Sequence, residues 1–113
     1  MRNSKDNKAY LLHIRDASDK ILAYVSTHNI DNFVANEWDQ DAVMRNLEII
    51  GEATNNMEGE FIKQYPEIPW KTIINLRNIL VHDYVDVDLN VVWQIITKDL
   101  PIFFKQISEI LNK

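Results

Sequence analysis

Three polar side chains interrupt one apolar stripe of the sequence, and they are the first candidates for chemistry. Arg77 stands at helical spacing from Ile73 and Leu80, so it falls where a core residue is expected. Asn78 interrupts a neighbouring row, and His82 follows it by one helical turn on the same face. Burying such groups costs free energy unless each finds a partner. The pattern therefore indicates either a polar network or a site.

Both interpretations stay open on the residues alone. As a structural group, Arg77 can join a polar network at a helix–helix or subunit contact, with Glu48 or Glu52 as partner. As a catalytic group, His82 can transfer protons near neutral pH, and an arginine can hold a phosphate through two parallel hydrogen bonds. The separation of Arg77 and His82 places them about 140° apart around a helix axis. They would grip a ligand from two sides, and Tyr84 adds a hydroxyl beyond the helix end.

Hydrophobic periodicity predicts the first two helices that must position these groups. Residues 8–27 carry an apolar face at alternating four- and three-residue spacing and end near Thr27. Asp39 or Asp41 can cap a second helix, in which Gly51 costs about 1 kcal/mol relative to alanine. The two apolar faces consist of Tyr10, Ile14, Ala17, Ile21 and Tyr24, and of Val43, Leu47, Ile50, Ala53 and Met57.

The second half of the chain predicts two more helices. Residues 58–69 contain Gly59 and two prolines and indicate a connection, after which Pro69-Trp70 opens a third helix that runs to about Val81. After a turn, Asp86 or Asp88 caps a fourth helix. Its apolar positions are Leu89, Val92, Ile96, Phe103, Ile107 and Ile110.

Pro101 should kink or restart this last helix, with Asp99 as a possible new cap. The whole pattern predicts an all-α fold, an up-and-down bundle of four to five helices. We expect a single domain over residues 1–113.

Other residues favour structural roles. Trp38, Trp70 and Trp93 fit core or interface positions at helix faces and helix starts, and Tyr10 and Tyr24 fit the core. A polar stripe about opposite the apolar face of the second helix indicates a solvated surface. It consists of Arg45, Glu48, Glu52 and Asn55.

Composition excludes several classes of chemistry. The 113 residues contain no cysteine, which removes thiol catalysis, disulfides, iron–sulfur clusters and cysteine-bound zinc. Gly51 and Gly59 stand alone, so a phosphate-binding loop or dinucleotide fingerprint is absent. His13 and His28 have no metal-ligand spacing, and the aspartates of residues 83–88 lack an EF-hand pattern. We expect neither a metal nor a cofactor.

Charge and hydropathy limit the classes of partner and the cellular location that the sequence allows. There are 17 acidic and 12 basic residues, for a net charge of -5, which weighs against broad binding to nucleic acid. Any nucleic-acid site must be local and built from a few basic side chains such as Arg45 and Arg77. The polar start of the chain and the lack of an apolar run of about 18 residues argue against secretion and membrane partners. We expect a cytoplasmic protein.

The run Arg77-Asn78-Ile79-Leu80-Val81-His82-Asp83-Tyr84 matches the R-x4-H-x-Y motif of the HEPN superfamily. The chain resembles the HepT-like (DUF86) branch, the toxins of HepT–MntA toxin–antitoxin pairs. Further segments agree in order and spacing, so that the resemblance covers about residues 8 to 110. These segments are residues 42–53, 66–70, 85–89, 92–93 and 99–101.

The resemblance implies a homodimer in which the motif helices meet at a cleft holding two arginines and two histidines. It implies metal-independent ribonuclease activity on RNA, with Arg77 on the scissile phosphate and His82 as general acid or base. The second helix of such proteins lines the cleft, so Glu48 or Glu52 can orient Arg77. Asn78 and Asp83 are further supporting candidates.

The resemblance also implies regulation by a partner. An MntA-like nucleotidyltransferase would transfer AMP onto Tyr84, and this bulky anion would repel an RNA phosphate. Some HEPN proteins keep the fold and bind nucleotides or partner proteins without cutting RNA. A non-catalytic binding module is therefore the alternative.

Overall fold

The computed structural model describes residues 4–75 and 87–113, and all of their regular secondary structure is helical. The predicted all-α class is therefore confirmed. The elements are α1 (Ser4–Thr27), α2 (Ile30–Ala35), α3 (Glu37–Asn56), α4 (Gly59–Lys63), α6 (Leu89–Gln94), the π-helical turn η2 (Ile95–Asp99) and α7 (Leu100–Leu111). Residues 70–75 are also helical. No helix in this described part of the chain is both long and apolar enough to cross a membrane.

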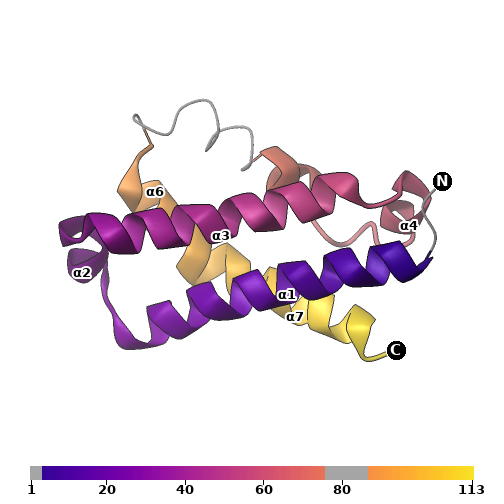
Figure 1. The fold of residues 1–113 in the computed structure, drawn as a ribbon, viewed down its shortest axis with the longest axis horizontal. Coiled ribbons are helices and arrows are strands. Elements are labelled where there is room, and N and C mark those ends of the chain that lie inside the picture. The colour runs from indigo at the N-terminus through magenta and orange to yellow at the C-terminus, as the bar shows by residue number, and fades with distance from the viewer. Residues whose placement is uncertain (1–3, 76–86) are drawn as a thin grey trace.

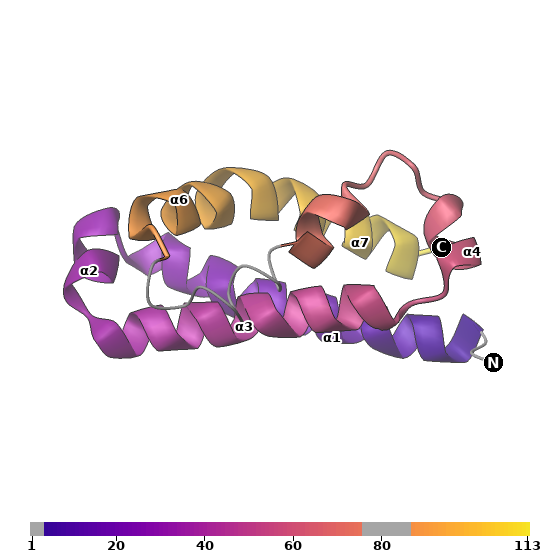
Figure 2. The same ribbon diagram turned by 90° about the horizontal axis from the view of Figure 1, so that it is seen from above.

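The two longest helices, α1 and α3, lie side by side and antiparallel (Figures 1 and 2). The continuous rod of α6, η2 and α7 forms a second layer over them (Figure 2), and both η2 and α7 pack against α1. The short α2 joins α1 to α3 at one end of the molecule. Both chain termini and α4 lie at the opposite end (Figure 1).

The predicted apolar faces form the core. All five predicted face residues of α3 are buried, with exposed fractions of 5% or less, and Gly51 is buried beside them. On α1 the core residues are Leu11, Ile14, Ala17 and Ile21. Tyr10 and Tyr24 are half-buried and pack against this core rather than inside it. The 3.6-residue period thus located the buried faces of both helices.

The start of α3 differs from the prediction. Neither Asp39 nor Asp41 is its cap: the side chain of Asn36 accepts a hydrogen bond from the Asp39 backbone N–H at 3.0 Å, and the helix begins at Glu37. The Asp39 carboxylate instead accepts a hydrogen bond from Tyr24 Oη at 2.8 Å. The Asp39 carboxylate, which the local sequence predicted as a cap, therefore makes a tertiary contact instead.

The short helix α2 explains why the start of α3 was misplaced. Asn29 and Asn32 form a reciprocal capping box at its start, with bonds of 2.9 and 2.8 Å. Asn36 ends α2 and caps α3 at the same time. Two asparagines at capping-box spacing were the available sequence signal, although glutamate or glutamine is the usual third residue of that motif.

The connection at 58–69 was expected without a helix, and it contains the short α4. Helical structure resumes at Trp70, as predicted, and the carbonyl of Pro69 accepts a hydrogen bond from the Ile73 N–H at 3.2 Å. The predicted end of this helix near Val81 and the candidate cap Asp86 lie outside the described residues.

The last helical rod confirms one cap and corrects another. Asp88 caps α6 by accepting a hydrogen bond from the Asn90 N–H at 2.9 Å. Asp99 makes no side-chain capping bond, and the rod does not restart. Instead η2 widens the helix just before Pro101, and the Leu100 N–H reaches back to the Ile95 carbonyl. The wider turn carries the chain past a residue that has no N–H to donate.

The predictions for the three tryptophans have different outcomes. Trp70 is buried and Trp93 is half-buried against the core. The interpretation of Trp38 as a core residue is wrong, because 84% of its surface is exposed. Its interpretation as an interface residue stays a prediction.

One hydrogen bond near each end fixes the register of α1 against α3. Near one end Tyr24 Oη donates to Asp39, and near the other Asn7 Oδ1 accepts from the Glu58 backbone N–H at 3.2 Å. Asn7 is only 3% exposed, so its amide has little access to water as a substitute partner.

We expect Asn7→Ala to lower the free energy of unfolding by about 1–3 kcal/mol, because it leaves the Glu58 N–H without its protein acceptor. Urea unfolding followed by circular dichroism measures this change. Asn55→Ala, on the exposed face of α3, is the matched control and should change the midpoint little. Equal midpoints for Asn7→Ala and the wild type would contradict the role of this bond.

Tyr24 should titrate late. Partial burial, the hydrogen bond to Asp39 and the negative charge of Asp39 raise the pKa of Tyr24 to about 12 from 10.0. Because the folded-state pKa is raised, the stabilising contribution of Tyr24 is full below pH 10 and is lost as the pH rises through 12.

The measurement is a phenolate absorbance titration of the wild type minus that of Tyr24→Phe. Asp39→Asn should lower the pKa of Tyr24 because it removes the negative charge. A difference curve centred on the ordinary tyrosine value would show that the contact with Asp39 does not hold in solution.

Candidate functional site

The motif residues predicted to act on RNA lie outside the described part of the chain. These residues are Arg77, Asn78, His82, Asp83 and Tyr84. The structure describes the segments that precede and follow the motif, and the α3 surface that carries Glu52.

The helical segment that leads into the motif is firmly anchored. The Trp70 indole N–H donates to the Tyr65 carbonyl at 3.0 Å, and its ring meets Phe103 of α7 edge to face at 6.1 Å. Trp70 and Ile73 are both buried. The start of this helix is thus held to α7 by core packing.

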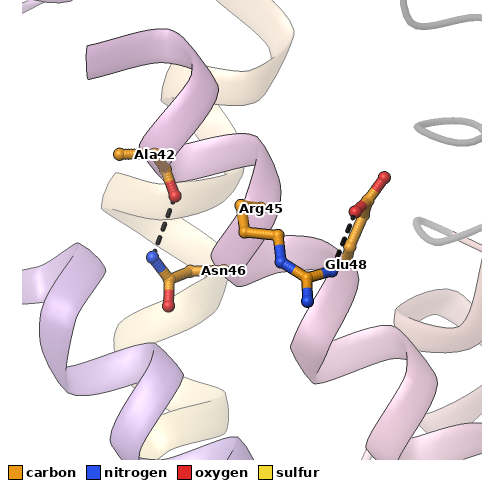
Figure 3. A network of polar contacts seen from close by, with 4 residues as sticks. All are labelled: Ala42, Arg45, Asn46 and Glu48. Atoms are coloured by element: carbon orange, nitrogen blue, oxygen red, sulfur yellow. Dashed lines mark hydrogen bonds and ion pairs between the residues drawn. The ribbon is translucent and has the colours of Figure 1, made fainter. Parts of the chain in front are cut away.

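The polar stripe of α3 faces solvent, as predicted, and contains an ion pair. Arg45 Nη1 lies 3.4 Å from Glu48 Oε2, one helical turn away (Figure 3). The Arg45 side chain is 69% exposed and that of Glu48 is 28% exposed. An exposed pair of this kind contributes about 0–1 kcal/mol, so the arginine can exchange its partner at low cost. Asn46 uses its amide locally, donating to the Ala42 carbonyl at 2.8 Å (Figure 3).

Glu52, the one predicted site residue that is described, is exposed on α3 and lines a small hollow between α1 and α3. The hollow has a volume of about 190 Å³. It brings together an imidazole, a guanidinium, a carboxylate, a phenol and an amide. Its lining residues are Tyr10, His13, Arg45, Ile49, Glu52, Ala53 and Asn56. Groups of this kind can bind a polar ligand through hydrogen bonds of both senses.

Two members of this hollow were missed from the sequence. His13 was considered only as a metal ligand and Tyr10 only as a core residue. Their rings lie 6.5 Å apart and edge to face on the flank of α1. The available signal was their three-residue spacing beside the apolar face, but only the pairing of α1 with α3 places them opposite Arg45 and Glu52.

A second hollow, of about 400 Å³, is mostly apolar. It lies among α3, residues 67–73 and the η2–α7 rod. Its apolar lining consists of Leu47, Ile50, Pro69, Ile73, Ile95, Leu100, Ile102 and Phe103. The charged residues that line it, Glu67 and Asp99, are both acidic, so it does not attract a phosphate.

Metal chemistry has no support in the described ranges. Within residues 4–75 and 87–113, no three histidine, aspartate or glutamate side chains gather closely enough to hold an ion. Arg77 itself lies outside these ranges, so its predicted contact with Glu48 or Glu52 stays a prediction. Glu48 already has Arg45 as an ion-pair partner.

Comparison with known proteins gives the family. Residues 14–110 match the family described as "Ribonuclease HepT-like". This range contains the whole motif and most of the described helices. No solved structure matches the chain.

Several curated relatives are similar over most of this chain. A Methanocaldococcus jannaschii protein named "Gamma-glutamylcyclotransferase and putative RNase" is 39% identical over 96% of this chain, which spans about half (49%) of that relative. A "Putative RNase" of Caldanaerobacter subterraneus subsp. tengcongensis is 36% identical, with 96% of this chain and 97% of the relative aligned. A "Probable ribonuclease HepT" of Thermococcus cleftensis is 36% identical over 86% of this chain and 88% of the relative.

The family matched over residues 14–110 is the one that the R-x4-H-x-Y motif indicated, and it is a family of ribonucleases. The expected enzyme class, an RNase, is therefore confirmed at the level of the family. This chain belongs to the ribonuclease HepT-like family of the HEPN superfamily.

Proposed function

We propose that this chain is a metal-independent endoribonuclease that acts as a homodimer, with Arg77 and His82 of both protomers in one cleft. The observation that carries the proposal is the sequence from Arg77 to Tyr84, which holds the motif and lies within the matched residues 14–110. The proposal treats residues 1–113 as a single domain of this family.

The reaction follows from the chemistry of these side chains. The ribose 2′-oxygen attacks the adjacent phosphorus, and the bond from phosphorus to the 5′-oxygen breaks, leaving a 2′,3′-cyclic phosphate. One His82 takes the proton from the 2′-hydroxyl, and His82 of the other protomer protonates the departing 5′-oxygen. Arg77 holds the phosphate oxygens and stabilises the charge that develops on them. In this division of roles one histidine acts as base and the other as acid, so the dimer supplies both groups.

The α3 surface supplies the described candidates for supporting such a site. Glu52 and Arg45 line the same hollow, and Arg45 is held only by an exposed ion pair. Glu52 can orient Arg77, while Asn78 and Asp83 belong to the motif segment itself. The chain carries a net charge of -5, so a substrate phosphate must be held by a few local cations rather than by a broad basic face.

We further propose that the protein is the toxin of a toxin–antitoxin pair. A partner nucleotidyltransferase of the MntA type transfers AMP onto the Tyr84 hydroxyl. The added phosphate places negative charge within two residues of His82 and repels the RNA backbone. A cytoplasmic location belongs to the same proposal, because a chain without cysteine fits a reducing compartment.

The second candidate is a HEPN module that binds a nucleotide or a protein without cutting RNA. The net charge of -5 favours it, because nucleic acid affinity rises with the number of cationic contacts. The two candidates differ in one property: only the first requires a titratable histidine at position 82 for its effect.

We expect His82→Ala to reduce RNA cleavage in EDTA by about 10²–10⁴-fold, because removing a positioned acid or base costs a factor of this size. The measurement is the rate of appearance of 2′,3′-cyclic phosphate ends from total cellular RNA. His28→Ala is the matched control, since His28 stacks on Tyr24 rather than lying in the motif.

Equal cleavage by the wild type and His82→Ala, with both proteins folded and dimeric, would rule out this catalytic role. A wild type that carries no AMP and still fails to cut RNA would instead favour the binding module. Mass spectrometry of the purified chain, performed first, shows whether AMP is attached.

Tyr84→Phe should keep its effect on cell growth when the partner nucleotidyltransferase is co-expressed, whereas the wild type should be neutralised. The substitution removes the hydroxyl that accepts AMP and keeps the ring. The measurement is colony formation, together with the mass of the purified chain. Tyr65→Phe, near the C-terminal end of α4, is the matched control. Neutralisation of Tyr84→Phe with AMP attached elsewhere would show that another residue is the acceptor.

A further inference from the structure

The end of the molecule built by α2 and the start of α3 presents large apolar side chains to solvent. Trp38, the second residue of α3, is 84% exposed, and Val34 of α2 is 48% exposed. Both helix segments lie at the end opposite the chain termini (Figure 1). Trp70, by contrast, is only 5% exposed. The core of the described chain therefore gives no reason for a tryptophan at position 38.

The backbone that carries Trp38 is held rigidly. The Gln40 side-chain amide donates to the carbonyls of both Phe33 and Val34 at 3.0 Å, which ties the end of α2 to the first turn of α3. Phe33 is fully buried and its ring lies 5.6 Å from that of Trp93 in α6. A partner that binds Trp38 would therefore lose little backbone entropy in ordering this surface, which favours affinity.

The segment that carries Trp38 is acidic, and Lys20 of α1 lines a hollow with Asp39 at its flank. Residues 29–44 contain four acidic side chains and neither lysine nor arginine. The acidic residues are Asp31, Glu37, Asp39 and Asp41. The neighbouring α6 has no basic residue either, and its cap is Asp88. The exposed apolar side chains thus stand within a negative surface.

The acidic charge decides which kind of partner this surface can bind. An RNA backbone or an anionic lipid surface would be repelled. A second copy in a two-fold dimer would place the same acidic residues against one another, because a two-fold interface pairs a patch with itself. A protein with an apolar pocket ringed by lysine and arginine matches both features. Tryptophan is also the residue type most enriched where binding energy concentrates.

We propose that Trp38 and Val34 anchor a docking surface for a protein partner whose complementary face is an apolar pocket with a basic rim. The partner is the nucleotidyltransferase, and in naming it this inference rests on the proposed function. Docking at Trp38 raises the local concentration of the transferase around its acceptor tyrosine and takes no part in the group transfer itself.

The test is calorimetric titration of the purified nucleotidyltransferase into the homodimer of the full chain. We expect Trp38→Ala to weaken binding by at least about 30-fold, the size that defines a binding hot spot. Ile102→Ala is the matched control, because Ile102 is 62% exposed on α7, and it should bind as the wild type does. Since Trp38 is exposed, its replacement should leave the urea midpoint unchanged.

A second variant tests the charge. Glu37→Lys should weaken binding and reduce its dependence on salt, whereas Glu109→Lys, exposed on α7, should do neither. In an assay of AMP transfer, Trp38→Ala should raise the KM for this chain and leave kcat unchanged, because the tryptophan acts on encounter and not on chemistry.

Each other outcome overturns the proposal. Equal affinity of Trp38→Ala and the wild type would show that the transferase docks elsewhere, while leaving its partnership intact. A wild type that does not bind the transferase would contradict the partnership in the proposed function as well. A change in the dimer mass of Trp38→Ala on ultracentrifugation would make a second copy the occupant, and a change in RNA retention on filters would make it RNA.

Discussion

The antiparallel pairing of α1 with α3 is the constraint on which the rest of the fold depends. Tyr24 bonded to Asp39 and Asn7 bonded to Glu58 fix the register near both ends of the pair. With that register set, the two apolar faces meet, and the η2–α7 rod packs over the helix pair. A helix pair that slipped by one turn would break both polar contacts and misalign every core layer, so the two bonds add specificity beyond their modest net energy.

The same pairing decides which polar groups share a surface. Tyr10 and His13 of α1 come to lie with Arg45 and Glu52 of α3 in one hollow because the helices run antiparallel at this register. Arg45 is held by an exposed ion pair with Glu48, so its charge remains available to another anion at small cost. Arg45 is thus an exposed cation on an otherwise acidic stretch of α3, which suits selective contact with a phosphate better than tight binding of a long nucleic acid.

Sequence patterns located the buried faces and limited the cap of α6 to Asp86 or Asp88, because those features depend on local periodicity and local hydrogen bonds. One error occurs where a tertiary contact competes with a local one. Asp39 was available as a cap, but its carboxylate bonds to Tyr24. Pro101 was expected to kink or restart the last helix with Asp99 as a possible cap, but Asp99 makes no side-chain capping bond and η2 carries the helix past Pro101 without a break. Periodicity left Trp38 as a core or an interface residue, and the core interpretation is wrong because spacing does not reveal which side of a helix start another element covers. The motif itself could be found only by resemblance, since pattern alone favours a structural network for Arg77 and His82.

An acidic ribonuclease poses an electrostatic problem that the distribution of its charge helps to resolve. Acidic residues without a base are concentrated in residues 29–44, around α2 and the start of α3, whereas Arg45 is the first cation that follows them on α3. A negative field at one end of a small molecule repels RNA from that end and leaves other faces for the substrate. It also makes that end attractive to basic protein surfaces. The net charge of the whole chain is therefore a poor guide to the repulsion of RNA and to the attraction of basic proteins. Each of these depends on where the charge lies and not on its total.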